Sequence, residues 1–362
     1  MKTKFPGHYQ LSAQQIKELW DTASIVLDTN VLLDFYRVSK QTSTELLGIL
    51  GDFAEQGRIF IPYQSANEYH ANILSVISGQ KKMYDEALKH LDKFNEDVAK
   101  KRSHPFMDED IANAFSDLYK KIKTNFKDKK DDLDHLLTEN EIKDKLGEML
   151  NGKVGDPFSD EDLAKIYKEG EGRYNNKIPP GFRDNNKNGN EKYGDLVVWK
   201  EIIQYSKNNA KSIIFVSSDT KEDWYQVIDG KTISPLPQLR EEFLRETGQT
   251  IHFYSLEQFL NHAKKEGKAH VSEQTINEVS NLLDLWERLK ILNSIHAKQA
   301  ISSSPIIEED GNEKHFGQIS TLDKDWTYSS QTQDSGQDST KKQATVIIPK
   351  KKKKYTIKRR KP

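Results

Sequence analysis

Three things are absent from this sequence, and each absence excludes a class of protein or site. There is no cysteine, which excludes disulfide bonds, thiolate catalysis and zinc sites built on cysteine. The first ten residues, MKTKFPGHYQ, contain no apolar core of a secretory signal peptide. No apolar run approaches the ~20 residues that a membrane-spanning helix needs. We therefore expect a cytoplasmic protein of a reducing compartment that has no membrane partner.

The chain is long and its charge is unevenly divided. Its 362 residues exceed the usual span of one compact domain. Residues 341–362 contain eleven lysines or arginines and no acid, which leaves 44 basic and 56 acidic residues in residues 1–340. Basic tails of this kind are usually disordered, and they bind nucleic acid about as often as they serve transport or solubility.

Strand-like and helix-like segments alternate in two parts of the chain, residues 11–77 and residues 173–265. The first part contains SAQQIKELWDTA, a helix that opens with a serine cap, and the strands SIVLD and RIFIP. The second contains the helices DLVVWKEIIQYSK and SLEQFLNHAKK and the strands SIIFVSS and TIHFY. This alternation predicts an α/β fold with a mainly parallel central sheet between two layers of helices.

The remaining segments differ in composition. Residues 78–172 are charged, and their large apolar residues recur at helical spacing with a break at His104-Pro105, which predicts a helical insertion. The segment EGEGRYNNKIPPGFRDNNKNGNEKYGD predicts a long functional loop. Residues 271–298 predict a C-terminal helix, and residues 302–362 predict a disordered tail with a basic end.

Four acids lie near the ends of apolar elements. Asp28 ends the strand SIVLD, and Asp219 follows the strand in SIIFVSSD. Asp195 opens the helix in KYGDLVVWKE, and Glu68 follows the strand RIFIP by about one helical turn. Because parallel strands present their carboxyl ends at one edge of a sheet, these acids can share one site. Asp223 can face the same place if a helical turn begins after Asp219.

Each acid also has a simpler explanation. Asp195 follows a glycine and is a good helix N-cap, Asp219 could cap in the same way, and Glu68 could face solvent. Asp28 resists such an explanation because it stands between IVL and NVLLDF, where an unpaired buried carboxylate is costly. Nothing comparable indicates a functional role for Asp34, on the following helix, so it is expected to be structural.

Converging carboxylates repel one another unless a cation joins them. Oxygen ligands without histidine or cysteine favour hard ions, Mg²⁺ or Mn²⁺. One such ion can lower the pKa of the attacking water, and a second, about 3.5 to 4 Å away, can stabilise the leaving oxygen. The four acids therefore predict a site that hydrolyses phosphodiester bonds.

The motif IVLDTNVLLDFY resembles the opening of a PIN domain, and Glu68, Asp195 and Asp219 match the second, third and fourth acids of that family. The combination of KIPPGFRD, YGDLVVWKEI and SSDTKEDW resembles a bacterial PIN-like group of large proteins with a long insertion. The resemblance covers about residues 20–262, with 78–175 matched only as an insertion. It implies a PIN-like three-layer fold and a metal-dependent endoribonuclease, often a toxin or an RNA-processing enzyme, and in the larger bacterial forms a part of antiviral defence against phage.

The match also implies roles for individual residues. Asp28 and the three acids that match the family would hold the metal ions, and Asp223 would be a fifth, peripheral acid. Hydroxyl and amide groups would orient ligands: Thr29, Asn30 and Ser217. Basic side chains are expected to bind phosphates: Arg173, Lys177, Arg183, Lys187, Lys200 and Lys221. Aromatic side chains are expected to stack on bases: Tyr174, Phe182 and Tyr193.

Loops are charged in any case, and asparagine is common in turns, so these binding residues have simpler explanations too. Arg183 is the preferred candidate because two rigid prolines and a glycine precede it closely in PPGFRD. Two other functions stay open. The chain could be a catalytically silent RNA-binding or scaffold module, against which the four acids argue, or a structure-specific DNA nuclease. A protein inhibitor or a defence-system partner is a further expectation, and the oligomeric state is not indicated.

Overall fold

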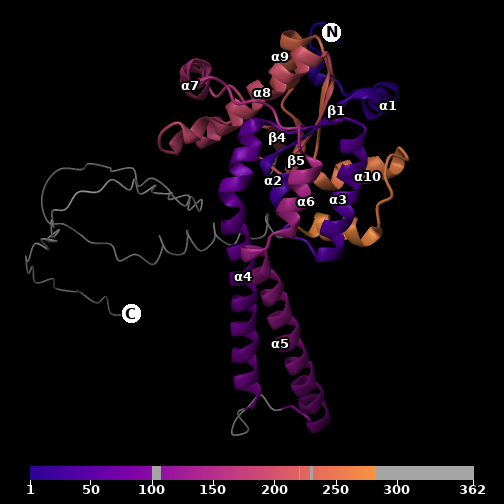
Figure 1. Ribbon diagram of the computed structural model, residues 1–362, viewed down its shortest axis with the longest axis vertical. Helices are drawn as coiled ribbons and strands as arrows, with labels where there is room; N and C mark the ends of the chain where they lie inside the picture. The colour runs from indigo at the N-terminus through magenta and orange to yellow at the C-terminus, as the bar shows by residue number, and fades with distance from the viewer. Residues whose placement is uncertain (100–106, 220, 229–230, 283–362) are drawn as a thin grey trace, which may run out of the picture. The chain divides into compact units, whose positions relative to one another are not determined.

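The computed structural model describes residues 1–99, 107–219, 221–228 and 231–282 (Figure 1). The chain divides into two units, Met1–Glu309 and Asp310–Pro362, and every element described below belongs to the first. The expected break at His104-Pro105 and the expected tail from residue 302 lie outside the described residues. Of the expected C-terminal helix, residues 273–282 are described and are helical.

A parallel sheet of four strands forms the centre of the fold, in the order β2-β1-β3-β6. Its strands are β1 (Ser24–Leu27), β2 (Ile59–Phe60), β3 (Ile213–Val216) and β6 (Ile251–Tyr254). The two central strands pair from Ser24 with Ile213 to Leu27 with Val216. Their side chains are mostly isoleucine, valine and phenylalanine, as strands buried on both faces require. The expected parallel α/β fold is confirmed.

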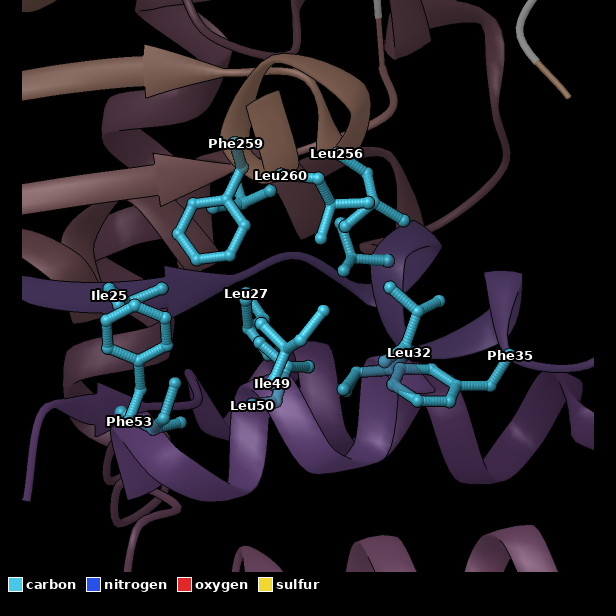
Figure 2. Close-up of a cluster of buried hydrophobic side chains, with 14 of the residues drawn as sticks. Ile25, Leu27, Leu32, Phe35, Ile49, Leu50, Phe53, Leu256, Phe259 and Leu260 are labelled. Carbon is cyan, nitrogen blue, oxygen red and sulfur yellow. The ribbon is translucent and has the colours of Figure 1, made fainter. Parts of the chain in front are cut away.

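Helices cover both faces of the sheet. The side chains of a strand alternate between its two faces, so an apolar strand has apolar side chains to bury on each face. On one face, Ile25 and Leu27 belong to a core shared with several helices (Figure 2). These helices are α1 (Ala13–Thr22), α2 (Thr29–Asp34), α3 (Lys40–Glu55) and α10 (Leu256–Lys265). On the other face, Val26 and Phe215 pack with α8 (Gly194–Asn209) and α9 (Pro237–Thr247). Figure 2 shows side chains of α10, such as Phe259, and side chains of α3, such as Leu50, pointing toward one another in this core.

Helix α1 begins with the serine cap that the sequence predicted, and α10 begins in the same way. The Ser12 hydroxyl accepts the Gln15 backbone N–H at the start of α1, and the Gln15 side chain accepts the Ser12 N–H in return. Ser255 and Gln258 form the same capping box at the start of α10. Each box satisfies backbone donors that the first helical turn leaves free.

The region predicted as an insertion is helical. Helix α4 (Tyr63–Ala99) passes through residue 78 without interruption and contacts α5 (Glu109–Thr138), as Figure 1 shows. Ring contacts join the two helices, among them Tyr84 with Phe126. Helices α6 (Glu141–Met149) and α7 (Asp160–Asn175) follow. None of the described helices is long and apolar enough to cross a membrane.

The prediction of one long loop from residue 169 to Asp195 is wrong at its start. Helix α7 continues to Asn175. Gly170 suggested a loop, but it lies in the helix, where a Cβ atom would come within 2.5 Å of the Tyr193 ring. The glycine therefore serves close packing rather than chain reversal. Only short 3-10 helices follow before α8: η2 (Phe182–Asn186) and η3 (Glu191–Tyr193).

Several further elements were not predicted, among them helix α9 on the second face of the sheet. An antiparallel hairpin of β4 (Tyr225–Ile228) and β5 (Lys231–Pro235) follows the loop after β3. A third 3-10 helix, η1 (Pro6–His8), precedes α1.

The connections place a switch point between β1 and β3. The chain leaves β1 toward β2 through helices on one face and reaches β3 through α8 on the other face. Neighbouring strands that lead to opposite faces open a crevice at their carboxyl ends, where open parallel sheets bind ligands. Residues that directly follow β1 and β3 therefore border this crevice.

Candidate active site

Asp28 directly follows β1 at the switch point, and three donors hold its carboxylate. The Thr29 backbone N–H donates to Oδ1 at 2.7 Å, and the Ser217 hydroxyl donates to Oδ2 at 2.7 Å. The Asn30 side-chain amide donates to Oδ2 at 3.4 Å. Asp28 is also the N-cap of α2, so capping, which the sequence favoured for Asp195, applies to Asp28 instead.

Burial makes the charged form of Asp28 unfavourable. It raises the pKa of Asp28 to about 6, against the opposing hydrogen bond from Ser217. The negative charges of Asp219 and Glu68 raise the pKa further. Carboxylates from the end of β1, from α4 and from the loop after β3 therefore act on one another electrostatically.

Glu68 comes from the second turn of α4 and is held rather than free in solvent. The Thr29 hydroxyl donates to Oε2 at 3.0 Å, and the Gln64 side chain donates to Oε1 at 2.8 Å. At Gly194, the first residue of α8, a Cβ atom would lie 2.8 Å from Glu68 Oε1. Glycine at this position lets α8 approach the carboxylate on α4.

Asp195 lies in the first turn of α8 but is not its cap. The N-cap position belongs to Tyr193, which makes no side-chain capping hydrogen bond. Asp195 Oδ2 instead accepts the indole N–H of Trp224 at 3.3 Å. The capping explanation for Asp195 is therefore wrong.

The ammonium group of Lys221 lies among three carboxylates. Its Nζ is 3.0 Å from Asp219 Oδ2, 3.7 Å from Asp184 Oδ2 and 3.9 Å from Asp195 Oδ2. Burial lowers the pKa of Lys221, but the three carboxylates outweigh burial and raise the pKa above its ordinary value. The Lys221 backbone N–H also donates to Asp219 Oδ1 at 3.0 Å, which fixes Asp219 in the turn after β3.

The same group of charges acts on Asp195. Burial raises the pKa of Asp195 well above its ordinary value, and Lys221 opposes this effect. Asp219, Asp184 and Asp28 add to the rise. The structure thus links the four predicted metal-binding acids to one another and to Asp184, which the sequence analysis did not single out. We call these five acids, Asp28, Glu68, Asp184, Asp195 and Asp219, the carboxylate cluster.

Asp223, four residues after Asp219, is fully buried. Its Oδ2 accepts the backbone N–H of Arg183 at 3.0 Å, so it joins the loop after β3 to η2. Its Oδ1 has no hydrogen-bond partner within the described part of the chain. Burial raises the pKa of Asp223, against the hydrogen bond from Arg183.

The predicted substrate-binding residues divide into two groups. Near the carboxylates lie Lys221, Lys187, with Nζ 3.0 Å from Asp184 Oδ2, and Arg183, paired with Glu222 at 2.9 Å. Lys200 instead pairs with Glu169 at 2.7 Å, and its role in phosphate binding stays a prediction.

Three residues assigned to the long loop are buried: Arg173, Tyr174 and Tyr193. The rings of Tyr174 and Tyr193 pack on each other with centroids 5.2 Å apart, so neither presents a free face for a base.

Asp34, expected to be structural, pairs with Arg37 at 2.7 Å and accepts the Ser218 hydroxyl at 2.8 Å.

The donor set of the carboxylate cluster fits a hard divalent cation, because it consists of acid oxygens from several elements without histidine. In the arrangement described, however, no three or more histidine, aspartate or glutamate side chains of the described residues are placed to hold a metal ion. Lys221 is the cation that three of the acids face. Carboxylates and Lys221 would have to rearrange for an ion to bind.

The fold and the site define a class of α/β proteins with acids gathered at the switch point of a parallel sheet. A family model described as a PIN-like domain matches residues 24–239, more than half of the chain, and the protein therefore belongs to the PIN-like domain family. PIN domains are generally nucleases, and all the acids discussed above lie within the matched residues. No curated protein and no solved structure matches the chain.

Proposed function

We propose that this protein is a metal-dependent endoribonuclease that hydrolyses RNA phosphodiester bonds by a two-metal mechanism, as a toxin or a phage-defence effector. One observation carries the proposal. Asp28, Asp219, Glu68 and Asp195 come from separate elements to one switch point, where their charges repel one another. Membership of a family whose domains are generally nucleases supports it.

In this proposal, Asp28, Glu68, Asp195 and Asp219 hold Mg²⁺ or Mn²⁺. When bound, the ions would supply an activated water and charge stabilisation for the leaving oxygen. The protein's own residues orient the ligands. Ser217 and the Thr29 backbone hold Asp28, and the Thr29 hydroxyl and Gln64 hold Glu68. Such outer contacts typically change metal affinity or activity by about 10- to 100-fold.

A polyanion that approaches an acidic centre needs cations beside that centre. Lys187 and Lys221 are 34 % and 36 % exposed at their side chains, and Arg183 is 59 % exposed. All three now pair with acids of the site or its border and can exchange these partners for phosphate oxygens. Asn30, which reaches Asp28, has an amide that can do the same.

The decisive experiment compares wild type with Asp28→Asn on total RNA and on single- and double-stranded DNA, in Mn²⁺ and in EDTA. We expect wild type to cut RNA only with Mn²⁺ and Asp28→Asn to be slower by more than about 100-fold, since a direct ligand should matter at least as much as an outer contact. Glu191→Gln removes an exposed acid from η3 and is the matched control.

Each alternative has its own signature in this experiment. Equal cleavage by Asp28→Asn, or cleavage in EDTA, would overturn the metal site. Cleavage of DNA without RNA would favour the DNA nuclease. RNA binding by wild type without cleavage under any condition would favour the scaffold.

A further inference from the structure

The 3-10 helix η2 brings an acid to the site that no strand end or α-helix delivers. Asp184 Oδ2 lies 3.7 Å from the Lys221 Nζ that also contacts Asp219 and Asp195. The side chains of Asp184 and Asp219 are equally exposed, at 12 %. We infer that Asp184 is a further ligand of the divalent cation. This inference rests on the proposed function.

Two contacts hold η2 in this position. Gly181 precedes it with a φ of +85°, and a Cβ atom there would lie 2.3 Å from the Tyr174 hydroxyl oxygen and 3.0 Å from Asp195 Cβ. Only glycine lets the backbone adopt this conformation so close to the first turn of α8. On the other side, buried Asp223 accepts the backbone N–H of Arg183, the residue before Asp184.

These anchors distinguish Asp184 from an ordinary loop acid. An acid that only makes a loop more soluble does not need a glycine packed against Asp195. It also does not need a buried carboxylate that accepts the backbone N–H of the preceding residue. Both anchors involve residues that the sequence assigned to the site, Asp195 as a metal ligand and Asp223 as a peripheral acid.

Ion pairing alone does not balance the charge of the carboxylate cluster to which Asp184 belongs. Its carboxylate is near two ammonium groups, those of Lys187 and Lys221. The same ammonium of Lys221 also serves Asp195 and Asp219, so these cations do not balance the five acids of the carboxylate cluster. A divalent cation would balance the excess, and Lys221 would then be released toward the phosphate of the substrate.

The test measures the Mn²⁺ dissociation constant of the full chain by titration calorimetry. We expect Asp184→Asn to weaken Mn²⁺ binding by at least about 10-fold and to slow RNA cleavage. Asp28→Asn should weaken binding as well, and Glu191→Gln, from the same connection before α8, should bind like wild type. Melting in EDTA checks that each variant folds, and Asp184→Ser repeats the comparison if Asp184→Asn does not fold.

The outcomes separate this inference from the proposed function. If Asp184→Asn and Asp184→Ser bind Mn²⁺ like wild type while Asp28→Asn does not, Asp184 is not a ligand and the proposed function stands. If wild type itself binds no Mn²⁺, both are overturned.

Discussion

Two groups of charged side chains lie beside α8, and their charges are balanced differently. One is the carboxylate cluster, in which five acids face few cations. The other, which we call the ion-pair network, joins two cations to two acids: Arg173, Lys200, Glu169 and Glu242. Arg173 donates to both carboxylate oxygens of Glu242 at 2.7 Å and to Glu169 at 3.0 Å, and Lys200 is 2.7 Å from Glu169.

The difference shows in the pKa values. Burial raises the pKa of Glu169, but Lys200 and Arg173 outweigh it and lower the pKa below its ordinary value. In the carboxylate cluster the pKa values of Asp28 and Asp195 are raised instead. The network has thus neutralised its charge internally, whereas the cluster keeps an excess that a cation or a proton must neutralise. Such unbalanced groups are typical of functional sites.

The largest expected effect on stability comes from breaking the balanced group. Arg173→Met leaves the partly buried Glu242 without its guanidinium partner, and we expect the free energy of unfolding to fall by about 3 to 5 kcal/mol. Urea unfolding at pH 7 measures it. The double variant Arg173→Met/Glu242→Gln keeps an acceptor for the Trp199 indole and should recover most of the loss. A double variant as unstable as the single one would mean that packing, not charge, is responsible.

The same kind of change in the carboxylate cluster should act in the opposite direction. Asp195→Asn keeps an acceptor for Trp224 and removes a repelled charge, so in EDTA we expect stability to be unchanged or raised by up to about 2 kcal/mol. Mn²⁺ at 100 times its dissociation constant should stabilise wild type by about 2.7 kcal/mol, and this gain should be lost in the variant. Thermal melting with and without Mn²⁺ measures both. A marked loss of stability in EDTA would place Asp195 with the structural ion pairs.

Those features of the fold and the site that depend on short sequence patterns could be predicted from the sequence. Asp28 and Asp219 could be found because each follows a short apolar strand, and Ser12 because capping needs only neighbours in sequence. The parallel sheet then followed from the alternation of strands and helices.

The missed parts depend on contacts between distant segments. Asp184 follows no strand, and its place is set by the approach of Gly181 to Asp195 and by the bond from Arg183 to Asp223. Arg173 was assigned to the loop because glycines surround it, but it is buried in α7. No pattern within a few residues carries this information.

Glu201 shows a third way to neutralise a buried acid, by protonation. Its Oε2 accepts the Gln64 backbone N–H at 3.1 Å, and the negative charge of Glu68 acts on it. Burial raises the pKa of Glu201 from 4.5 to about 7, against that hydrogen bond. The folded protein therefore keeps a proton between pH 4.5 and 7 that the unfolded chain has released, so this contribution to stability is lost as pH rises through 7.

Glu201→Gln should remove this pH dependence. We expect wild type in EDTA to lose roughly 1 to 3 kcal/mol more stability than the variant between pH 5 and pH 8. Urea unfolding at the two pH values measures the difference, and Glu191→Gln should follow wild type. Equal slopes for wild type and Glu201→Gln would show that Glu201 ionises at its ordinary pKa and belongs with neither charge group.

The smallest expected effect is that of Lys200→Met. It tests whether the ion-pair network takes part in RNA binding together with the carboxylate cluster. Lys200 was predicted to bind phosphate, but its ammonium pairs with Glu169 in the ion-pair network. We expect Lys200→Met to change stability by less than about 1 kcal/mol and to leave the salt dependence of RNA binding as it is. Lys207→Met, which breaks another pair on α8, is the control. A phosphate contact would instead lower the slope of log affinity against log salt by about one. That result would extend the RNA surface from the carboxylate cluster across α8 and make the network part of substrate binding.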